Sequence, residues 1–231
     1  MVNSAQTHLL LRGCNSFLVN NVVVESPANS PNTDGIHIHS STNIIITNSR
    51  FASGDDCISI GDRISNIRID NVECGPGHGI SIGSLGRQGN QVQVEKIHIS
   101  DVLFKGTTNG ARIKTWQVGR GYVRDVIFEN LMFDGVQNPI IIDQSYCDVR
   151  NACKEEETGV EISNVRYREI HGTSSSEMGI NLNCSRSVPC NEISMESIQL
   201  TSIDPGKDIV AGCANAYGQE YQVSPSPCLL N

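Results

Sequence analysis

Short stretches of alternating apolar and polar residues recur along the whole chain. In each, two apolar residues two positions apart are followed, two positions further on, by a polar residue. Strict alternation predicts β-strands, because successive side chains of a strand point to opposite faces, whereas a helical stripe needs a spacing of about 3.6 residues. The seven stretches are Phe17-x-Val19-x-Asn21, Ile44-x-Ile46-x-Asn48, Ile67-x-Ile69-x-Asn71, Ile97-x-Ile99-x-Asp101, Val126-x-Phe128-x-Asn130, Val165-x-Tyr167-x-Glu169 and Ile193-x-Met195-x-Ser197.

A second set of short apolar strands lies between the first, separated from it by turns rich in Gly, Asn, Asp and Ser. Self-similarity at roughly 20 to 40 residues indicates a solenoid, in which one repeat cannot bury its apolar face but a stack of repeats can. Since no helical pattern intervenes, we predict an all-β fold: a right-handed single-stranded parallel β-helix, or β-solenoid. The second set comprises Ile36-x-Ile38, Ile58-x-Ile60, Ile80-x-Ile82, Ala111-x-Ile113, Ile140-x-Ile142, Ile180-x-Leu182 and the residues from Ile209 onward.

An antiparallel β-sandwich is the alternative fold. It would need tight hairpin turns at regular spacing. Asn109-Gly110 stands alone and belongs to no series of Asn-Gly hairpins. The β-helix is therefore favoured.

The recurring asparagines are expected to be structural. Inward isoleucines of a β-helix would stack about 4.8 Å apart, the spacing of paired strands. Asn21, Asn48, Asn71 and Asn130 follow these isoleucines at a constant offset. Inside the helix they would form a partial amide ladder, because a side-chain amide both donates and accepts hydrogen bonds.

The two ends of the repeat differ. Val2 to Leu11 already has the strand pattern, with no polar capping element before it. A solenoid with an uncapped end exposes its apolar stack. We therefore expect residues 1–231 to form a single β-helix domain that lacks its N-terminal coils. The Ser- and Pro-rich run at 224–228 predicts a tail, from about residue 214 to 231, packed on the C-terminal end.

Charge excludes two classes of partner. The net charge is -8 and the pI is about 5.2, whereas nucleic acids and anionic membranes are bound mainly through basic surfaces. No stretch approaches the roughly 20 apolar residues that span a bilayer. We therefore expect no nucleic-acid and no membrane partner, and a monomer.

Nine cysteines indicate an oxidising compartment and a secreted protein, although the first residues do not form a signal peptide. No CxxC pair with zinc-ligand spacing is present. The sequon Asn183-Cys184-Ser185 makes Asn183 a candidate for N-glycosylation. The four closest cysteine pairs, predicted as disulfides, are Cys57 with Cys74, Cys147 with Cys153, Cys184 with Cys190, and Cys213 with Cys228.

Titratable residues recur at one position of the repeat. Asp34, Asp56 and His78 each lie two residues before a second-set isoleucine, at equal intervals of 22 residues. In a β-helix this equality places them in one column on three consecutive turns, about 4.8 Å apart. Adjacent strand residues face opposite sides, so Asp55 and Asp56 can share one cleft only if the backbone bends there, which Gly54 would permit.

A column of this kind favours acid and base catalysis. Clustered carboxylates repel one another, so at least one is expected to have a raised pKa and hold a proton. Glycoside hydrolysis needs one such acid and a second carboxylate. Arg112 and Lys114 alternate with Ile113, so both should point outward beside the carboxylates and bind a carboxylate-bearing substrate.

Each motif also has a structural interpretation. An Asp-Asp pair before a strand usually caps a turn, and Arg-x-Lys on a strand usually faces solvent. Neither explains why the motifs share one position of the repeat. A metal site is disfavoured because Arg112 and Lys114 would repel the cation, so we expect neither metal nor cofactor.

Four motifs in order resemble the signatures of the polygalacturonases, family 28 of the glycoside hydrolases. The residues around Cys57 and Cys74 are similar to the plant branch of this family, whose members normally carry a signal peptide and further N-terminal coils. The motifs are Asn32-Thr33-Asp34, Gly54-Asp55-Asp56, Gly77-His78-Gly79 and Arg112-Ile113-Lys114.

The resemblance implies a right-handed parallel β-helix, pectin or polygalacturonate as partner, and inverting hydrolysis of α-1,4 bonds between galacturonic acid units during remodelling of the plant cell wall. It implies that Asp55 is the general acid, that Asp34 and Asp56 activate water, and that His78 supports the acid. Arg112 and Lys114 would hold substrate carboxylates, and Tyr146 would line a subsite.

Two alternative functions stay open. A catalytically impaired, truncated β-helix would bind pectin without turnover. A lyase of similar architecture would need calcium and would leave an unsaturated product that absorbs ultraviolet light.

Overall fold

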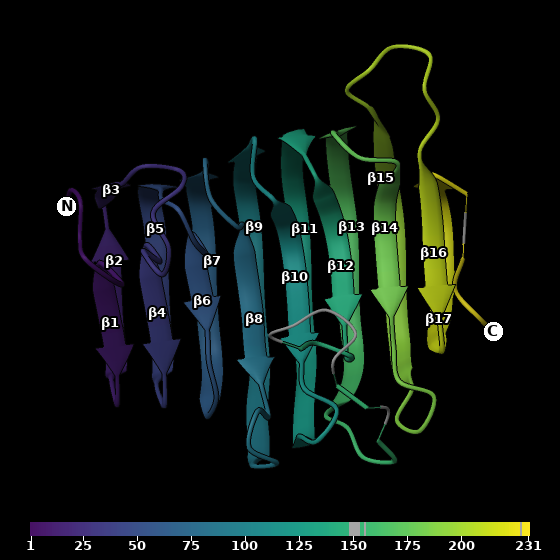
Figure 1. The fold of residues 1–231 in the computed structure, drawn as a ribbon, viewed down its shortest axis with the longest axis horizontal. Coiled ribbons are helices and arrows are strands. Elements are labelled where there is room, and N and C mark those ends of the chain that lie inside the picture. The colour runs from purple at the N-terminus through teal and green to yellow at the C-terminus, as the bar shows by residue number, and fades with distance from the viewer. Residues whose placement is uncertain (148–152, 155, 227) are drawn as a thin grey trace.

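The computed structural model describes residues 1–147, 153–154, 156–226 and 228–231, and within these ranges every regular element is a β-strand. The strands lie side by side along the long axis of the molecule (Figure 1). They are β1 (Leu9–Arg12), β2 (Asn15–Asn20), β3 (Val23–Glu25), β4 (Ile36–His39), β5 (Thr42–Ala52), β6 (Ile58–Ile60), β7 (Ile64–Cys74), β8 (Ile80–Leu85), β9 (Gln91–Lys105), β10 (Asn109–Thr115), β11 (Arg120–Val136), β12 (Asn138–Asp143), β13 (Glu161–Ser174), β14 (Met178–Asn183), β15 (Cys190–Ser202), β16 (Val210–Ala214) and β17 (Ala216–Ser224).

The strands form two sheets that the chain visits in turn. One sheet has eight strands in the order β1-β4-β6-β8-β10-β12-β14-β16. The other has nine, in the order β17-β15-β13-β11-β9-β7-β5-β2, with β3 also paired to β5. The named strand pairs in the described part of the chain are all parallel. This topology confirms the parallel β-helix and rules out the antiparallel sandwich.

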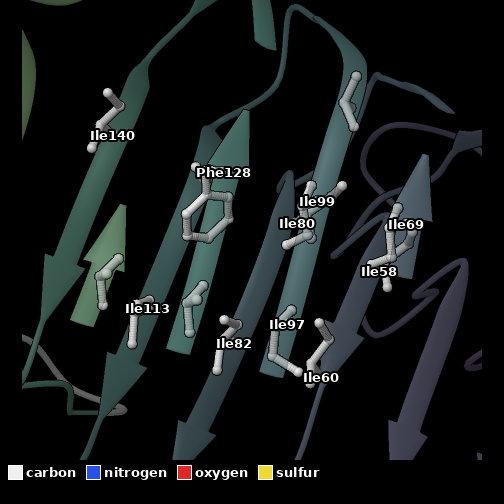
Figure 2. Packing of buried hydrophobic residues seen from close by; sticks show 14 of the residues in the cluster. Ile58, Ile60, Ile69, Ile80, Ile82, Ile97, Ile99, Ile113, Phe128 and Ile140 are labelled. Carbon is white, nitrogen blue, oxygen red and sulfur yellow. The ribbon is translucent and has the colours of Figure 1, made fainter. Parts of the chain in front are cut away.

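Inward side chains of successive turns are in register. Ile36 pairs with Ile58, and Ile58 with Ile80, so one aliphatic column runs along the eight-stranded sheet. Ile44 and Ile67 belong to a second column on the nine-stranded sheet. All five side chains are buried, and side chains from both sheets meet in the interior (Figure 2). Burial of apolar area of this kind supplies the main favourable free energy of folding.

The asparagine ladder exists, but its expected position inside the helix is wrong. Asn21, Asn48, Asn71 and Asn130 are all exposed. Asn71 donates through its amide nitrogen to the side-chain oxygen of Asn48 (2.7 Å). Asn48 donates in the same way to Asn20, not to Asn21 (2.8 Å).

Backbone conformation explains the error. Each of the four asparagines has a positive φ, between 48° and 58°, a region that asparagine tolerates better than most residues. A second residue with positive φ lies five positions before each polar position of the repeat. These pairs bend the long strands of the nine-stranded sheet around the core. In the long strands they are Asn43 and Asn48, Asn66 and Asn71, Lys96 and Asp101, Asp125 and Asn130, Asn164 and Glu169, and Glu192 and Ser197; Ser16 and Asn21 form the corresponding pair at β2.

The four predicted disulfides are confirmed. They join Cys57 to Cys74, Cys147 to Cys153, Cys184 to Cys190, and Cys213 to Cys228.

The C-terminal segment continues the solenoid and is fastened to it. Residues 216–224 of the expected tail form β17, which extends the nine-stranded sheet. Leu230 then bridges back to Tyr217, and Cys228 is fastened to Cys213. Residue 227, within the predicted tail, lies outside the described residues. The described residues include no helix long and apolar enough to cross a membrane.

The columns predict very different costs for two neighbouring substitutions on β5. Ile46 is fully buried and Ile45 is 43% exposed. Ile46→Ala should lower the free energy of unfolding by about 2–5 kcal/mol, because it removes transfer free energy and leaves a cavity. Ile45→Ala should change it by roughly 0.5 kcal/mol or less. Urea denaturation measures both, and similar losses for the two variants would contradict the assignment of the core face.

Candidate active site

Three consecutive turns present the predicted titratable residues on the outer side of the eight-stranded sheet. The Gly35 N–H donates to the Asp56 carbonyl oxygen (2.9 Å), and the Cys57 N–H donates to the Gly79 carbonyl oxygen (2.8 Å). Together with the pairing of β4, β6 and β8, these bonds put Asp34, Asp56 and His78 at equivalent positions of adjacent turns.

Asp56 is the most enclosed carboxylate of the column. Its side chain is 3% exposed and accepts from both predicted cations. Arg112 Nη2 lies 2.7 Å from Asp56 Oδ1, and Lys114 Nζ lies 3.0 Å from Oδ2. Both cations come from β10 and are themselves nearly buried, with 13% and 10% of their side chains exposed. A charge this deep is tolerated because it is paired and hydrogen-bonded.

Ser81 completes this arrangement and was not singled out from the sequence. Its hydroxyl donates to Asp56 Oδ1 (2.8 Å) and accepts from Arg112 Nε (2.8 Å). Ser81 pairs directly with Arg112 in the β8–β10 register. The sequence signal that could have found it is therefore its position, one residue after Ile80, just as Arg112 lies one residue after Ala111.

Asp55 lies beside Asp56 and faces His78. His78 Nδ1 is 3.1 Å from Asp55 Oδ1, and the N–H groups of Asn32 and Asp56 donate to the same carboxylate at 3.2 and 2.8 Å. Burial alone would raise the pKa of Asp55, but the hydrogen bonds from His78 and from the Asp56 N–H lower it to about 2.

The backbone bends at Gly54 and Asp55, as predicted, and the glycine is required for a second reason as well. A Cβ at this position would lie 2.1 Å from the Ser30 carbonyl oxygen, so any side chain would collide with the loop that carries Asn32 and Asp34. The Gly54 N–H also donates to the Thr33 hydroxyl (3.0 Å). The glycine thus allows close approach of two turns, and the Asp34 and Asp55 carboxylates gather as a result.

Asp34 holds the proton of this cluster. Burial first, and then the negative charges of Asp56 and Asp55, raise the pKa of Asp34 to about 7. This agrees with the expectation that crowding raises the pKa of at least one carboxyl. The raised pKa belongs to Asp34, however, and not to Asp55, the carboxyl to which the resemblance gives the role of acid.

Tyr146 lies next to the cations. Lys114 Nζ is 5.6 Å from the centre of the Tyr146 ring, and the ring meets Trp116 edge-on at 5.6 Å. Trp116 continues the alternation of Arg112 and Lys114, and Arg87 lies 5.4 Å above its ring. Aromatic rings with a nearby cation are a surface on which sugar rings can pack.

The remaining candidate residue, Asn183, lies away from the column. It is exposed at the end of β14, and its amide is 3.5 Å from Asp143 Oδ1. Its glycosylation stays a prediction.

A cation has a poor fit in the column. Asp55, Asp56 and His78 each offer one ligand atom, and these atoms lie within 4.8 Å of one another. Both Asp56 oxygens, however, already accept from Arg112 and Lys114, whose charges would repel a metal ion. The donor set therefore favours proton transfer over metal binding.

The family of the chain follows from its sequence profile. The profile of the family described as "Glycosyl hydrolases family 28" matches residues 1–222. The chain belongs to this family. Its predicted fold is confirmed as a right-handed parallel β-helix, the fold of the family's solved members.

Relatives of this family 28 chain are similar over nearly all of it. Polygalacturonase QRT2 of Arabidopsis thaliana is 44% identical over 213 residues, 92% of this chain and 48% of that protein. A polygalacturonase of Prunus persica is 42% identical over 230 residues, 99% of this chain and 58% of that protein. The chain thus spans about half the length of the curated relatives it matches.

Two solved structures agree with the fold. The polygalacturonase from Erwinia carotovora ssp. carotovora has a TM-score of 0.79 and 28% identity, covering 94% of this chain and 55% of that one. The endo-xylogalacturonan hydrolase from Aspergillus tubingensis has a TM-score of 0.77 and 25% identity, covering 87% and 56%.

The raised pKa of Asp34 predicts a loss of stability with rising pH. The pKa is about 7 in the folded protein against 3.8 for the free side chain, so between these values the folded state holds a proton that the unfolded chain has released. The free energy of unfolding should therefore fall as the pH rises from about 4 to about 7.

Asp34→Asn replaces the titrating carboxyl with a neutral amide. The variant should therefore be more stable than the wild type at pH 8, and its gain in the free energy of unfolding should be smaller at pH 4. Urea denaturation at the two pH values measures the difference. Asp134→Asn, at an exposed position on β11, is the matched control. A gain for Asp34→Asn that is the same at both pH values would contradict the assigned pKa.

Proposed function

We propose that this chain hydrolyses the α-1,4 bonds between galacturonic acid units of pectin, outside the cell, in the remodelling of the plant cell wall. One observation carries the proposal. A buried carboxylate, Asp56, is clamped by Arg112 and Lys114 beside two further carboxylates that have widely separated pKa values. Carboxyls with separated pKa values are what acid and base catalysis of glycoside cleavage requires.

The relatives support the choice of substrate. The similar proteins from Arabidopsis thaliana and Prunus persica described above are both named polygalacturonases. Four disulfides fit an extracellular protein. Because the chain covers about half of these relatives, the activity is proposed for the site that it contains.

Arg112 and Lys114 serve two partners in this proposal. Each donates one hydrogen bond to Asp56, and Arg112 donates another to Ser81. A guanidinium has five N–H donors and an ammonium three, so donors remain for the carboxylate of a galacturonate. Tyr146, beside Lys114, would pack against the same sugar unit.

Asp55 acts as the acid once substrate is bound. In the free site its low pKa keeps it ionised, through His78 and two backbone N–H groups. The carboxylate of a bound galacturonate adds a like charge and excludes water, and both effects raise the pKa of a neighbouring carboxyl. Asp55 thereby takes up a proton from solvent and gives it to the leaving glycosidic oxygen as that C–O bond breaks. The water held between Asp56 and Asp34 bonds to the anomeric carbon and gives one proton to the Asp56 carboxylate.

Inversion at the anomeric carbon is part of the proposal, and it rests on the family resemblance. Oxygens of Asp55 and Asp56 lie within 4.8 Å of each other. Inverting glycosidases generally keep their two carboxyls about 6.5–9.5 Å apart, and retaining ones about 5–5.5 Å. The oxygens of Asp55 and Asp56 are thus closer than the usual inverting range, and the configuration of the product tests inversion directly.

Release of reducing ends from polygalacturonate tests the proposed function. The wild type should release them without added calcium at acidic pH. Asp55→Asn should reduce the rate by about 10²–10⁴-fold, the usual contribution of a general acid. Asp204→Asn, at an exposed position in the loop that follows β15, should leave the rate unchanged.

Two results would contradict hydrolysis. Binding of polygalacturonate by the wild type with no release of reducing ends would identify a binding β-helix without turnover. A calcium-dependent product that absorbs ultraviolet light would identify a lyase.

A further inference from the structure

A polar pocket lies on the C-terminal side of the proposed active site. Its cavity volume is about 360 Å³. Loops that follow β10, β12, β14 and β16 surround it, so four successive turns contribute to one hollow. Its described lining includes Gln117, Asn183, Cys184, Ser185, Arg186 and Asn215.

The pocket continues the face that carries the catalytic column. Lys114 pairs with Asp143, and Asp143 with Asn183, so these three side chains share one position on adjacent strands. Asn183 therefore lies two strand spacings, about 9.6 Å, beyond Lys114 along the solenoid axis. A chain substrate held by Lys114 and extended along the sheet would reach the pocket.

The chemistry of the pocket suits an acidic sugar. Arg186 is the one charged residue of the described lining, and none of the ion pairs found in the described part of the chain includes it. Gln117 uses its side-chain oxygen to accept from the Glu156 N–H, which leaves its amide N–H groups as donors. Asn215 donates to the Cys184 carbonyl oxygen (3.0 Å), which leaves its side-chain oxygen as an acceptor. Hydroxyls and one carboxylate are the complementary groups.

The loop that contains Arg186 is held in place by its neighbours. The Ser185 N–H donates to Gln144 Oε1 (2.7 Å), and Gln144 Nε2 donates to the Val160 carbonyl oxygen (2.7 Å). Gln144 is 1% exposed, and Cys184 is fixed to Cys190 by a disulfide. A loop that is ordered before binding loses less conformational entropy when a ligand arrives.

Asp143, between Lys114 and the pocket, would oppose an anionic ligand only when it is ionised. Burial raises its pKa, although the Ser145 N–H, Asn183 and Arg112 oppose the rise. The charged groups that face it from β10 are Arg112 and Lys114, while β14 presents Asn181 and Asn183. Asp143 therefore stays neutral over a wider acidic range than a free aspartate.

We propose that this pocket is a second sugar-acid site, in which Arg186 pairs with the carboxylate of a galacturonate two turns beyond the one held by Lys114. The inference rests on the proposed function, because it places the two sites on one chain substrate. It also competes with the glycosylation predicted at Asn183, since a glycan on that side chain would fill the pocket.

Binding of hexagalacturonate to protein that carries Asp55→Asn tests the site without any need for turnover. Adding Arg186→Gln should raise the Kd by about tenfold, the loss expected for one charge-assisted pair. The Kd for a fully methyl-esterified hexamer should change much less, because that ligand has no carboxylate. Arg166→Gln, which removes the same charge from an exposed position on β13, should alter neither value.

Three results would overturn the proposal: an unchanged Kd for hexagalacturonate, an equal change for the acid and the ester, or full glycosylation of Asn183 in protein from a plant secretory host. Thermal denaturation of Arg186→Gln separates loss of the site from loss of the fold. Failure of the proposed function would instead appear as wild-type protein that releases no reducing ends, whatever Arg186→Gln does to binding.

Discussion

Parallel backbone hydrogen bonds between successive turns hold the whole site in register. The bonds from Gly35 to Asp56 and from Cys57 to Gly79 make adjacent turns equivalent. Since paired strands are about 4.8 Å apart, any residue type repeated at the length of one turn becomes a column of close neighbours. Carboxylates that are 22 residues apart in the chain are thereby brought within range of each other's charge, which the raised pKa of Asp34 reflects.

Such crowding is costly, and the fold offsets the cost locally. Asp56 is enclosed by Arg112, Lys114 and Ser81, so its charge is paired and its oxygens are hydrogen-bonded. Asp55 is satisfied by His78 and two backbone N–H groups. Asp34 lacks a comparable set of donors and keeps its proton instead. The separation of the pKa values thus follows from which carboxylate receives the donors.

Much of this arrangement could be predicted from spacing. Alternation at Ile44 and Ile46 predicts a strand, and equal intervals at Asp34, Asp56 and His78 predict a column. The disulfides follow from cysteines close in the sequence. The asparagine ladder was misplaced because a residue with positive φ at a bend has the same periodicity as an inward polar residue. The positive φ of Asn71 in the structure identifies it as a residue at a bend and not as an inward one.

Other features depend on three-dimensional contacts that spacing does not contain. Ser81 joins the site because β8 pairs with β10. Arg112 and Lys114, which clamp Asp56, lie 56 and 58 positions after it in the sequence. The bend at Gly54 is predictable from the sequence, but the close approach of Ser30, which also requires this glycine, is not. The distribution of protons between Asp34 and Asp55 depends on individual hydrogen-bond donors, which a count of carboxylates cannot show.

The configuration of the first product tests the account most directly. Proton NMR of polygalacturonate during the first minutes of reaction distinguishes the two anomers before they equilibrate. Attack by a water held at Asp56 and Asp34, with Asp55 as the acid, predicts that the new reducing end forms as the β-anomer. An initial α-anomer would show that a carboxylate attacks the sugar and the bond is broken with retention, which would contradict the proposed roles.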